Sequence, residues 1–149
     1  MEKEGMFQAT GRLVLASGSP RRRDMLAGLG VLFTQQTAAV EEPAPDEGEE
    51  PAAYAMRTAR IKAGGVAKEC AGAVVLAADT VVALPGRILG KPGNEAEALA
   101  MLTELTGPEP GSSRDHEVVT GVCLLDLRDG EKEKFFAAHT LVSMGWYAQ

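Results

Sequence analysis

The sequence predicts an α/β fold, a single domain with a mixed β-sheet. Short apolar runs of strand length alternate along the chain with segments whose composition and capping residues favour helices. The chain has 149 residues, of which 45% are hydrophobic and 24% are charged, as in an ordinary globular domain. A domain of this size buries roughly two-thirds of the surface of its unfolded chain, so a substantial core is expected.

The first elements are predicted as strand, loop, helix and strand. Residues 13–16 form a short apolar run that is typical of a buried strand. Ser19 suits a helix N-cap and Pro20 suits the first helical position, so a helix is expected over residues 21–29. Residues 32–37 are predicted as a second strand.

The middle of the chain begins with an acidic, proline-rich loop over residues 41–51. An alanine-rich helix is expected over residues 52–69. Residues 73–78 are apolar and are predicted as a buried strand that ends at Asp79-Thr80. Residues 81–84 are expected to continue extended, and a turn at Pro85-Gly86 then leads to a short returning strand at residues 87–89.

The last part of the chain is predicted as a helix followed by a hairpin. Asn94 is the expected N-cap of the helix, whose apolar stripe should lie in the core. That stripe consists of Leu99, Leu102 and Leu105. After a loop at residues 108–115, strands are expected over residues 116–127 and 135–144, joined by the turn signal Asp129-Gly130.

Composition and charge exclude several classes of protein. The formal net charge of −6 argues against non-specific binding to nucleic acid or to an anionic membrane. Cys70 and Cys123 are far apart and fit no zinc or disulfide pattern, so each is expected to be a buried thiol in a reducing compartment. No apolar run approaches the length of a membrane span, and a cytoplasmic protein is expected. Residues 1–11 are predicted as an N-terminal extension.

The strand–loop–helix around residues 17–22, Ser-Gly-Ser-Pro-Arg-Arg, suits an anion-binding site. Free backbone N–H groups at a helix start attract phosphate, and small residues let it approach closely. Arg21 and Arg22 add donors that match phosphate oxygens. A plain capped helix with a basic surface turn is the alternative, and the loop alone does not decide between the two.

Two further side chains are candidates for a site. Asp79 follows a buried strand, where a carboxylate can bind a divalent cation or accept a proton from water, or simply cap the strand end. Lys62 lies near the apolar face of its helix, so its ammonium either extends to solvent along that face or points into a site. Lys91 and Glu42 are expected in loops, and neither residue indicates a functional site by itself.

Taken together, these residues resemble the Maf family of nucleotide pyrophosphatases. The similar segments run in the family's order: residues 15–22 (LASGSPRR), 41–42 (EE), 59–63 (ARIKA), 78–80 (ADT), 89–92 (LGKP) and 116–121 (HEVVTG). The resemblance implies one α/β domain with two lobes around a cleft, similar to the inosine triphosphate pyrophosphatases. It covers residues 12–149, but the chain ends before a C-terminal segment that the family normally has.

The resemblance also implies an activity, the hydrolysis of a nucleoside triphosphate to a monophosphate and pyrophosphate. Asp79 matches the family's general base. Asp79 and Glu42 match its metal-binding positions, and magnesium or manganese is the expected cofactor. The matching substrate-binding residues are Ser17, Arg21, Arg22, Lys62 and Lys91. Arg21 and Thr80 match the specificity residues of the branch that acts on dTTP and UTP.

Two functional hypotheses follow from this resemblance. The first is a hydrolase that cleaves dTTP, UTP and modified pyrimidine nucleotides. The second, motivated by the missing segment, is a catalytically impaired nucleotide-binding protein that regulates growth or septation. The expected partner is a nucleoside triphosphate, with no nucleic acid and no membrane. A homodimer is one option, because the sequence does not set the oligomeric state.

Overall fold

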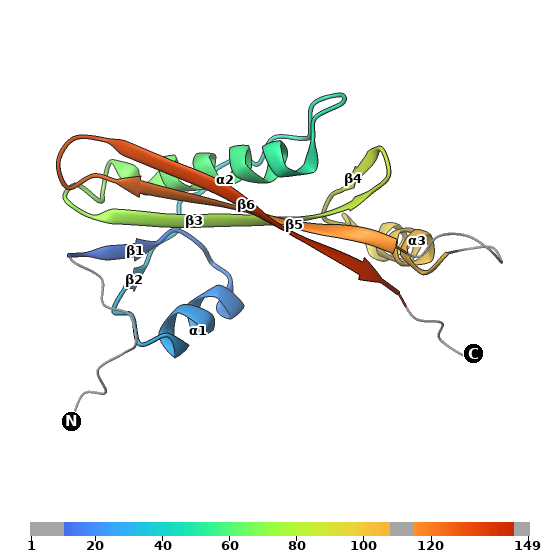
Figure 1. The fold of residues 1–149 in the computed structure, drawn as a ribbon, viewed down its shortest axis with the longest axis horizontal. Coiled ribbons are helices and arrows are strands. Elements are labelled where there is room, and N and C mark those ends of the chain that lie inside the picture. The colour runs from blue at the N-terminus through green and yellow to red at the C-terminus, as the bar shows by residue number, and fades with distance from the viewer. Residues whose placement is uncertain (1–10, 108–114, 145–149) are drawn as a thin grey trace.

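The protein folds into one mixed β-sheet with helices around it, in a computed structural model that describes residues 11–107 and 115–144 (Figure 1). The α/β class and the mixed sheet predicted from the sequence are confirmed. The predicted N-terminal extension (apart from Gly11) and the predicted loop at residues 108–115 (apart from Asp115) lie outside the described residues. No helix in the described part of the chain is both long and apolar enough to cross a bilayer.

The elements, in chain order, are β1 (Leu13–Leu15), α1 (Pro20–Gly28), β2 (Thr34–Gln35), α2 (Pro51–Ala67), β3 (Val74–Leu84), β4 (Arg87–Leu89), α3 (Glu95–Thr106), β5 (Asp115–Asp126) and β6 (Lys132–Ser143).

Within the described residues the sheet has six strands in the order β2-β1-β3-β5-β6, with β4 on β3 as well. β1 pairs in parallel with β2 and β3, whereas β3 pairs antiparallel with β4 and β5, and β5 antiparallel with β6. The three long strands β3, β5 and β6 form a twisted ribbon (Figure 1). β1, β2 and α1 lie near one end of this ribbon, and β4 and α3 lie near the other.

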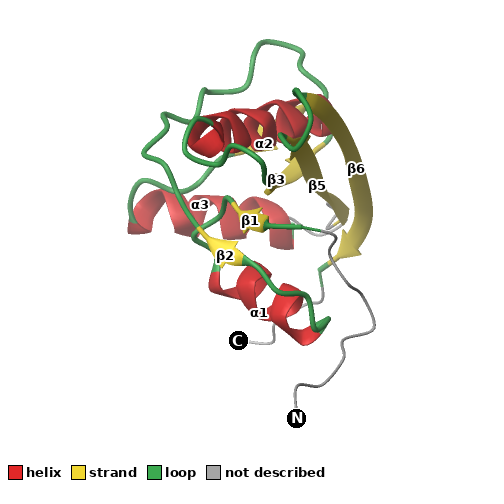
Figure 2. Cartoon of the chain, turned by 90° about the vertical axis from the view of Figure 1, so that its left-hand side faces the viewer, coloured by secondary structure: helices red, strands yellow, loops and turns green. Residues whose placement is uncertain are grey.

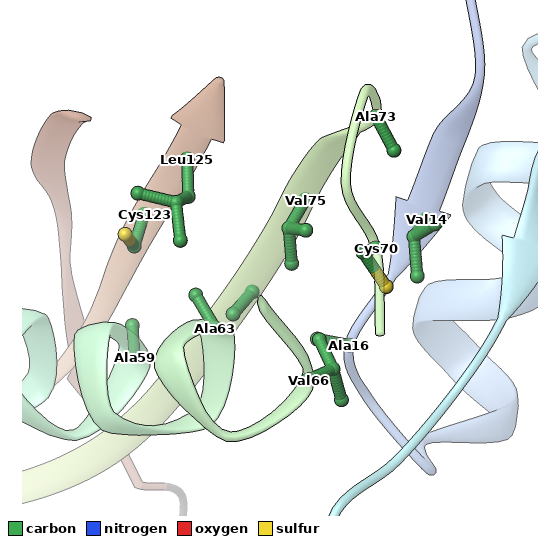
Figure 3. Close-up of a cluster of buried hydrophobic side chains, with 11 residues drawn as sticks. Val14, Ala16, Ala59, Ala63, Val66, Cys70, Ala73, Val75, Cys123 and Leu125 are labelled. Atoms are coloured by element: carbon green, nitrogen blue, oxygen red, sulfur yellow. The ribbon is translucent and has the colours of Figure 1, made fainter. Parts of the chain in front are cut away.

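Helix α2 covers one face of the long strands (Figure 2). Ala55, Ala59 and Ala63 of α2 are buried on the same side of the helix because positions four apart share one side. The cluster of buried side chains between α2 and the sheet is shown in Figure 3. It includes Ala59 and Ala63 of α2 against Val75 of β3 and Cys123 of β5. Cys70 and Cys123 are buried and free, as predicted.

The structure corrects the predicted bounds of two strands near the site. β2 has two residues instead of the six predicted at residues 32–37, because only Thr34 and Gln35 lie beside β1. The strand predicted to end at Asp79-Thr80 and the extended residues 81–84 form one unbroken strand, β3, because the β5 ladder continues through Asp79, which pairs with Gly121.

The prediction that the stripe on α3 lies in the core is also wrong. Asn94 does cap this helix, accepting a hydrogen bond from the Glu97 N–H at 2.8 Å. However, α3 has no buried residue, and Leu99 and Leu102 are 67% and 53% exposed. A helical period places leucines on one side, but another element must cover that side before they become core.

Candidate functional site

The candidate site lies at a break along one edge of β3. β1 and β4 both pair with this edge, since the other edge is taken by β5. The β1 ladder ends at Leu76 and the β4 ladder begins at Val82, so residues 77–81 have no strand partner there. Asp79 is at the centre of this break. The sequence predicted a ligand site at the end of a strand. In the structure, Asp79 lies just beyond the end of the parallel β1–β3 pairing and inside the longer strand β3.

The Ser17–Ser19 loop leaves β1 at this break. Ser19 is the N-cap of α1: its Oγ accepts a long hydrogen bond from the Arg22 N–H, at 3.4 Å, and Pro20 follows at the first helical position. Ser17 is buried, and its Oγ accepts from the Ser19 N–H at 3.2 Å. The Ser17 hydroxyl therefore keeps its own proton for a ligand.

Gln35 was not recognised as a site residue from the sequence. Its Nε2 donates to the Ser17 carbonyl oxygen at 2.5 Å, so β2 holds the loop from the side. A glutamine in a short strand has no distinctive sequence signal, because its role depends on which residue its side chain contacts in the folded protein.

Arg22 connects the loop to the break in β3. Its Nη1 donates to the Ala78 carbonyl oxygen at 3.1 Å and to Ser17 Oγ at 3.4 Å, and its Nη2 donates to Thr80 Oγ1 at 3.1 Å. The guanidinium thus binds a backbone carbonyl of β3 in the break, where no strand pairs with this edge. Arg21 is exposed and takes no part in this arrangement, so the arginine beside Thr80 is Arg22.

Lys62 joins two carboxylates from different parts of the chain. Its Nζ lies 2.7 Å from Asp79 Oδ1 and 3.1 Å from Glu42 Oε1. Lys62 reaches Asp79 because helical side chains lean toward the helix N-terminus, which lies above this part of β3. Of the two alternatives for Lys62, the structure shows the one in which the ammonium points into the site.

Lys91 completes a row of alternating charges. Lys91 lies in the loop that follows β4, and its Nζ is 3.7 Å from Glu42 Oε1. Partial burial of Glu42 raises the pKa of its carboxyl, but the hydrogen bonds and charges of Lys62 and Lys91 outweigh this effect, so the pKa lies below its ordinary value. Asp79, Lys62, Glu42 and Lys91 therefore form a chain of charge pairs across the site.

A cavity of about 360 Å³ opens beside these groups. The structure brings five of the predicted site residues to its wall: Ser17, Arg22, Glu42, Lys62 and Lys91. Asp79 lies directly behind Lys62, and Thr80 is reached through Arg22, while Arg21 does not line the cavity. Three of the five wall residues are cationic, which favours an anionic ligand.

Two glycines allow the surrounding elements to approach closely enough to form the site. A Cβ on Gly121 would lie 2.3 Å from the Ala55 carbonyl carbon, so this glycine lets α2 rest directly on β5 beside Asp79. A Cβ on Gly65 would lie 2.6 Å from Val40 Cγ1, so this glycine admits the segment that leads to Glu42. Neither contact could be inferred from the sequence, because each joins residues distant in the chain.

Comparison with solved structures defines the class of fold. The chain has the fold of the Ham1 proteins, an α/β domain with a mixed sheet. The Ham1 protein of Staphylococcus aureus superposes with a TM-score of 0.56 at 15% identity, covering 90% of this chain and 72% of that one. A nucleoside-triphosphatase / dITP/XTP pyrophosphatase from Mycobacterium abscessus gives a TM-score of 0.51 at 18% identity, covering 89% and 73%.

Sequence comparison then identifies the family. The sequence model described as Maf-like protein matches residues 12–147, and this chain belongs to that family. The dTTP/UTP pyrophosphatase of Oleidesulfovibrio alaskensis is 48% identical over 124 residues, which are 83% of this chain and 54% of the relative. The dTTP/UTP pyrophosphatase of Myxococcus xanthus is 46% identical over 144 residues, 91% of this chain and 68% of the relative. The chain thus spans about half to two-thirds of the length of these relatives.

Proposed function

We propose that this protein is a nucleoside triphosphate pyrophosphatase that converts dTTP and UTP to the monophosphate and pyrophosphate. One observation carries the proposal: Ser17, Arg22, Lys62 and Lys91 come from three separate segments of the chain and line one cavity, with Asp79 behind Lys62. A hydroxyl donor and three cations suit the negative charge of a triphosphate. The names of the curated relatives favour this activity over the binding-only hypothesis.

In the proposed reaction, a water oxygen attacks the α-phosphorus and the bond from that phosphorus to the α,β-bridging oxygen breaks. Asp79 accepts the proton of the water, and pyrophosphate leaves with the bonding electron pair. The hydrogen bond to Lys62 holds the Asp79 carboxylate in place. Lys62 and Lys91 are positioned to offset the charge that develops on the leaving pyrophosphate.

A divalent cation fits the donors of this site. Glu42 and Asp79 both contact the Lys62 ammonium, so their oxygens already flank a single positive charge. The described residues contain no group of three or more His, Cys, Asp or Glu side chains that could hold a metal ion. Two carboxylates suit magnesium or manganese, which complete their shell with water and phosphate oxygens. When bound, the cation would neutralise phosphate charge.

The proposal is tested by incubating the protein with dTTP, UTP or 7-methyl-GTP in the presence of magnesium or manganese and measuring pyrophosphate and monophosphate. We expect turnover of dTTP and UTP, and at least a hundredfold loss in Asp79→Asn, because general-base catalysis typically contributes about 10²–10⁴-fold. Asp129→Asn makes the same chemical change in the exposed β5–β6 turn and should retain full activity. Equal activity of the two variants would refute the role of Asp79, and binding of dTTP without turnover would support the binding-only hypothesis.

The same assay tests the cation. Removing divalent ions with a chelator should abolish turnover, and Glu42→Gln should raise the metal concentration needed for half-maximal rate. Restoration by magnesium or manganese, but not by sodium at equal ionic strength, would support a specific site. Turnover that is unaffected by the chelator would exclude the cation from the reaction.

A further inference from the structure

A pair of threonine hydroxyls lies on the sheet next to the proposed phosphate site. Thr80 of β3 and Thr120 of β5 are directly opposite each other across the two strands, and their Oγ1 atoms are 2.8 Å apart. Successive side chains of a strand alternate between faces, so this pair lies on the opposite face of the sheet from Asp79. Thr80 is exposed and Thr120 is half-buried, so the pair is open to a ligand.

Arg22 ties this hydroxyl pair to the phosphate site. Its Nη2 donates to Thr80 Oγ1 while its Nη1 reaches Ser17 Oγ and the Ala78 carbonyl. A ligand whose phosphates bind Ser17 and Arg22 therefore lies beside the hydroxyl pair, because the same guanidinium contacts Ser17 and Thr80. The triphosphate already has Ser17 and three cations around the cavity, so the neutral, polar pair outside this cavity is left for the nucleoside part of the nucleotide.

The hydrogen-bond inventory fixes what the pair can offer. A guanidinium only donates, so one lone pair of Thr80 Oγ1 is taken by Arg22. The two hydroxyls carry two protons, and their mutual bond uses one of them. One proton is left to point outward. When Thr120 donates to Thr80, both lone pairs of Thr80 are occupied, and Thr80 can act toward a ligand only as a donor.

We propose that Thr120 is a specificity-determining residue that makes Thr80 a hydrogen-bond donor to a ring carbonyl oxygen of the pyrimidine base. This inference rests on the proposed function. The two nucleotides in the relatives' name, dTTP and UTP, differ at the ribose 2′ position and at the ring methyl, but they share both ring carbonyls. A donor that contacts the base of both nucleotides therefore reads a ring carbonyl, because N3 carries a proton and N1 carries the sugar. Without Thr120, the Thr80 hydroxyl has a free lone pair and can donate or accept, so it discriminates less.

The test measures binding of UMP, 2-thio-UMP and 4-thio-UMP by titration calorimetry, because sulfur in place of a carbonyl oxygen is a poor acceptor. The variants are Thr120→Val and Thr120→Ala, which remove the hydroxyl, and Thr120→Ser, which keeps it. Thr140→Val is the matched control, since Thr140 is an exposed threonine on the same face of the sheet, opposite Val118. Turnover of UTP is measured in parallel on the unmodified protein.

We expect the unmodified protein to bind one of the two thio analogues about two- to tenfold more weakly than UMP, the range of one neutral hydrogen bond. Thr120→Ser and Thr140→Val should keep this difference, whereas Thr120→Val and Thr120→Ala should reduce it. Equal binding of all three ligands by the unmodified protein would overturn the proposal, as would a difference that stays undiminished in both hydroxyl-free variants. A lack of pyrophosphate release from UTP would instead count against the proposed function, while the binding data would still decide the role of Thr120.

Discussion

Substitution of Gly121 by alanine tests whether the close approach of α2 to β5 builds the site. The added Cβ would lie 2.3 Å from the Ala55 carbonyl carbon and 2.4 Å from the Met56 nitrogen. Both are backbone atoms, so no side-chain rotation can relieve the contact. Ordinary contact begins at 3.4 Å, so α2 must move away from the sheet by about 1 Å.

The cost follows from this displacement. Overpacking of a well-packed core costs about 1–3 kcal/mol, and the rigid backbone places Gly121→Ala toward the upper end. Replacing glycine recovers about 0.5–1 kcal/mol of conformational entropy, which leaves a net loss of about 2 kcal/mol. For a protein of this size the midpoint of thermal unfolding should fall by roughly 4–8 °C. The same movement stretches the 2.7 Å contact between Lys62 and Asp79, and turnover should fall about 10- to 100-fold.

Gly64→Ala is the matched control for this experiment. Gly64 is an exposed residue of α2, and a Cβ there would meet nothing within 4 Å. Because alanine favours a helix over glycine by about 0.8–1 kcal/mol, this variant should unfold at a slightly higher temperature and keep its activity. Thermal unfolding followed by circular dichroism, with turnover of UTP on the same samples, makes the comparison. A Gly121→Ala protein as stable and as active as Gly64→Ala would refute the reasoning.

Three further predictions concern single side chains. Because the pKa of Glu42 is lowered in the folded state, its contribution to stability is present above the unfolded-state pKa and is lost as the pH falls through the folded-state pKa. Glu42→Gln should therefore make the free energy of unfolding, measured with urea, depend less on pH across this acidic range. An unchanged pH profile would contradict the pairing with Lys62. Arg22→Ala should raise the KM for UTP more than Arg21→Ala, since only Arg22 lines the cavity, and equal effects in steady-state kinetics would count against the cavity as the substrate site. Burial first, and then Glu133, raise the pKa of Cys123 to about 11, so alkylation by iodoacetamide at pH 8 should be slow until the protein unfolds, and rapid labelling of the native protein would disprove this.

Local features of the structure were predictable because their causes are local. Ser19 and Pro20 begin α1 as predicted, since an N-cap hydroxyl and a fixed proline φ act within one helical turn. Asp129-Gly130 marks the β5–β6 turn for the same reason, with Gly130 at a φ of +77°. Asp79 was singled out because it follows an apolar run of strand length, and α/β sheets place ligand sites at the ends of their strands.

Features that depend on a distant neighbour were not predictable. The strand containing Asp79 is unbroken at Asp79-Thr80 because β5 pairs with it there, and the apolar stripe of α3 is exposed because no described element covers it. Gly121 and Gln35 appear ordinary in the sequence, although one sets the height of α2 above the sheet and the other holds the Ser17 carbonyl. In each case the deciding contact joins residues far apart in the chain.

The two adjacent arginines mark the boundary between what sequence and structure determine. The sequence by itself determined a strand, a small-residue loop and a capped helix carrying Arg21 and Arg22, and therefore a positive charge at the start of α1. It could not determine which arginine meets Thr80. Adjacent residues of a helix point about 100° apart, so only one of them can face the sheet. The position of α1 beside the break in β3 makes that residue Arg22, because helix orientation is fixed by tertiary contacts.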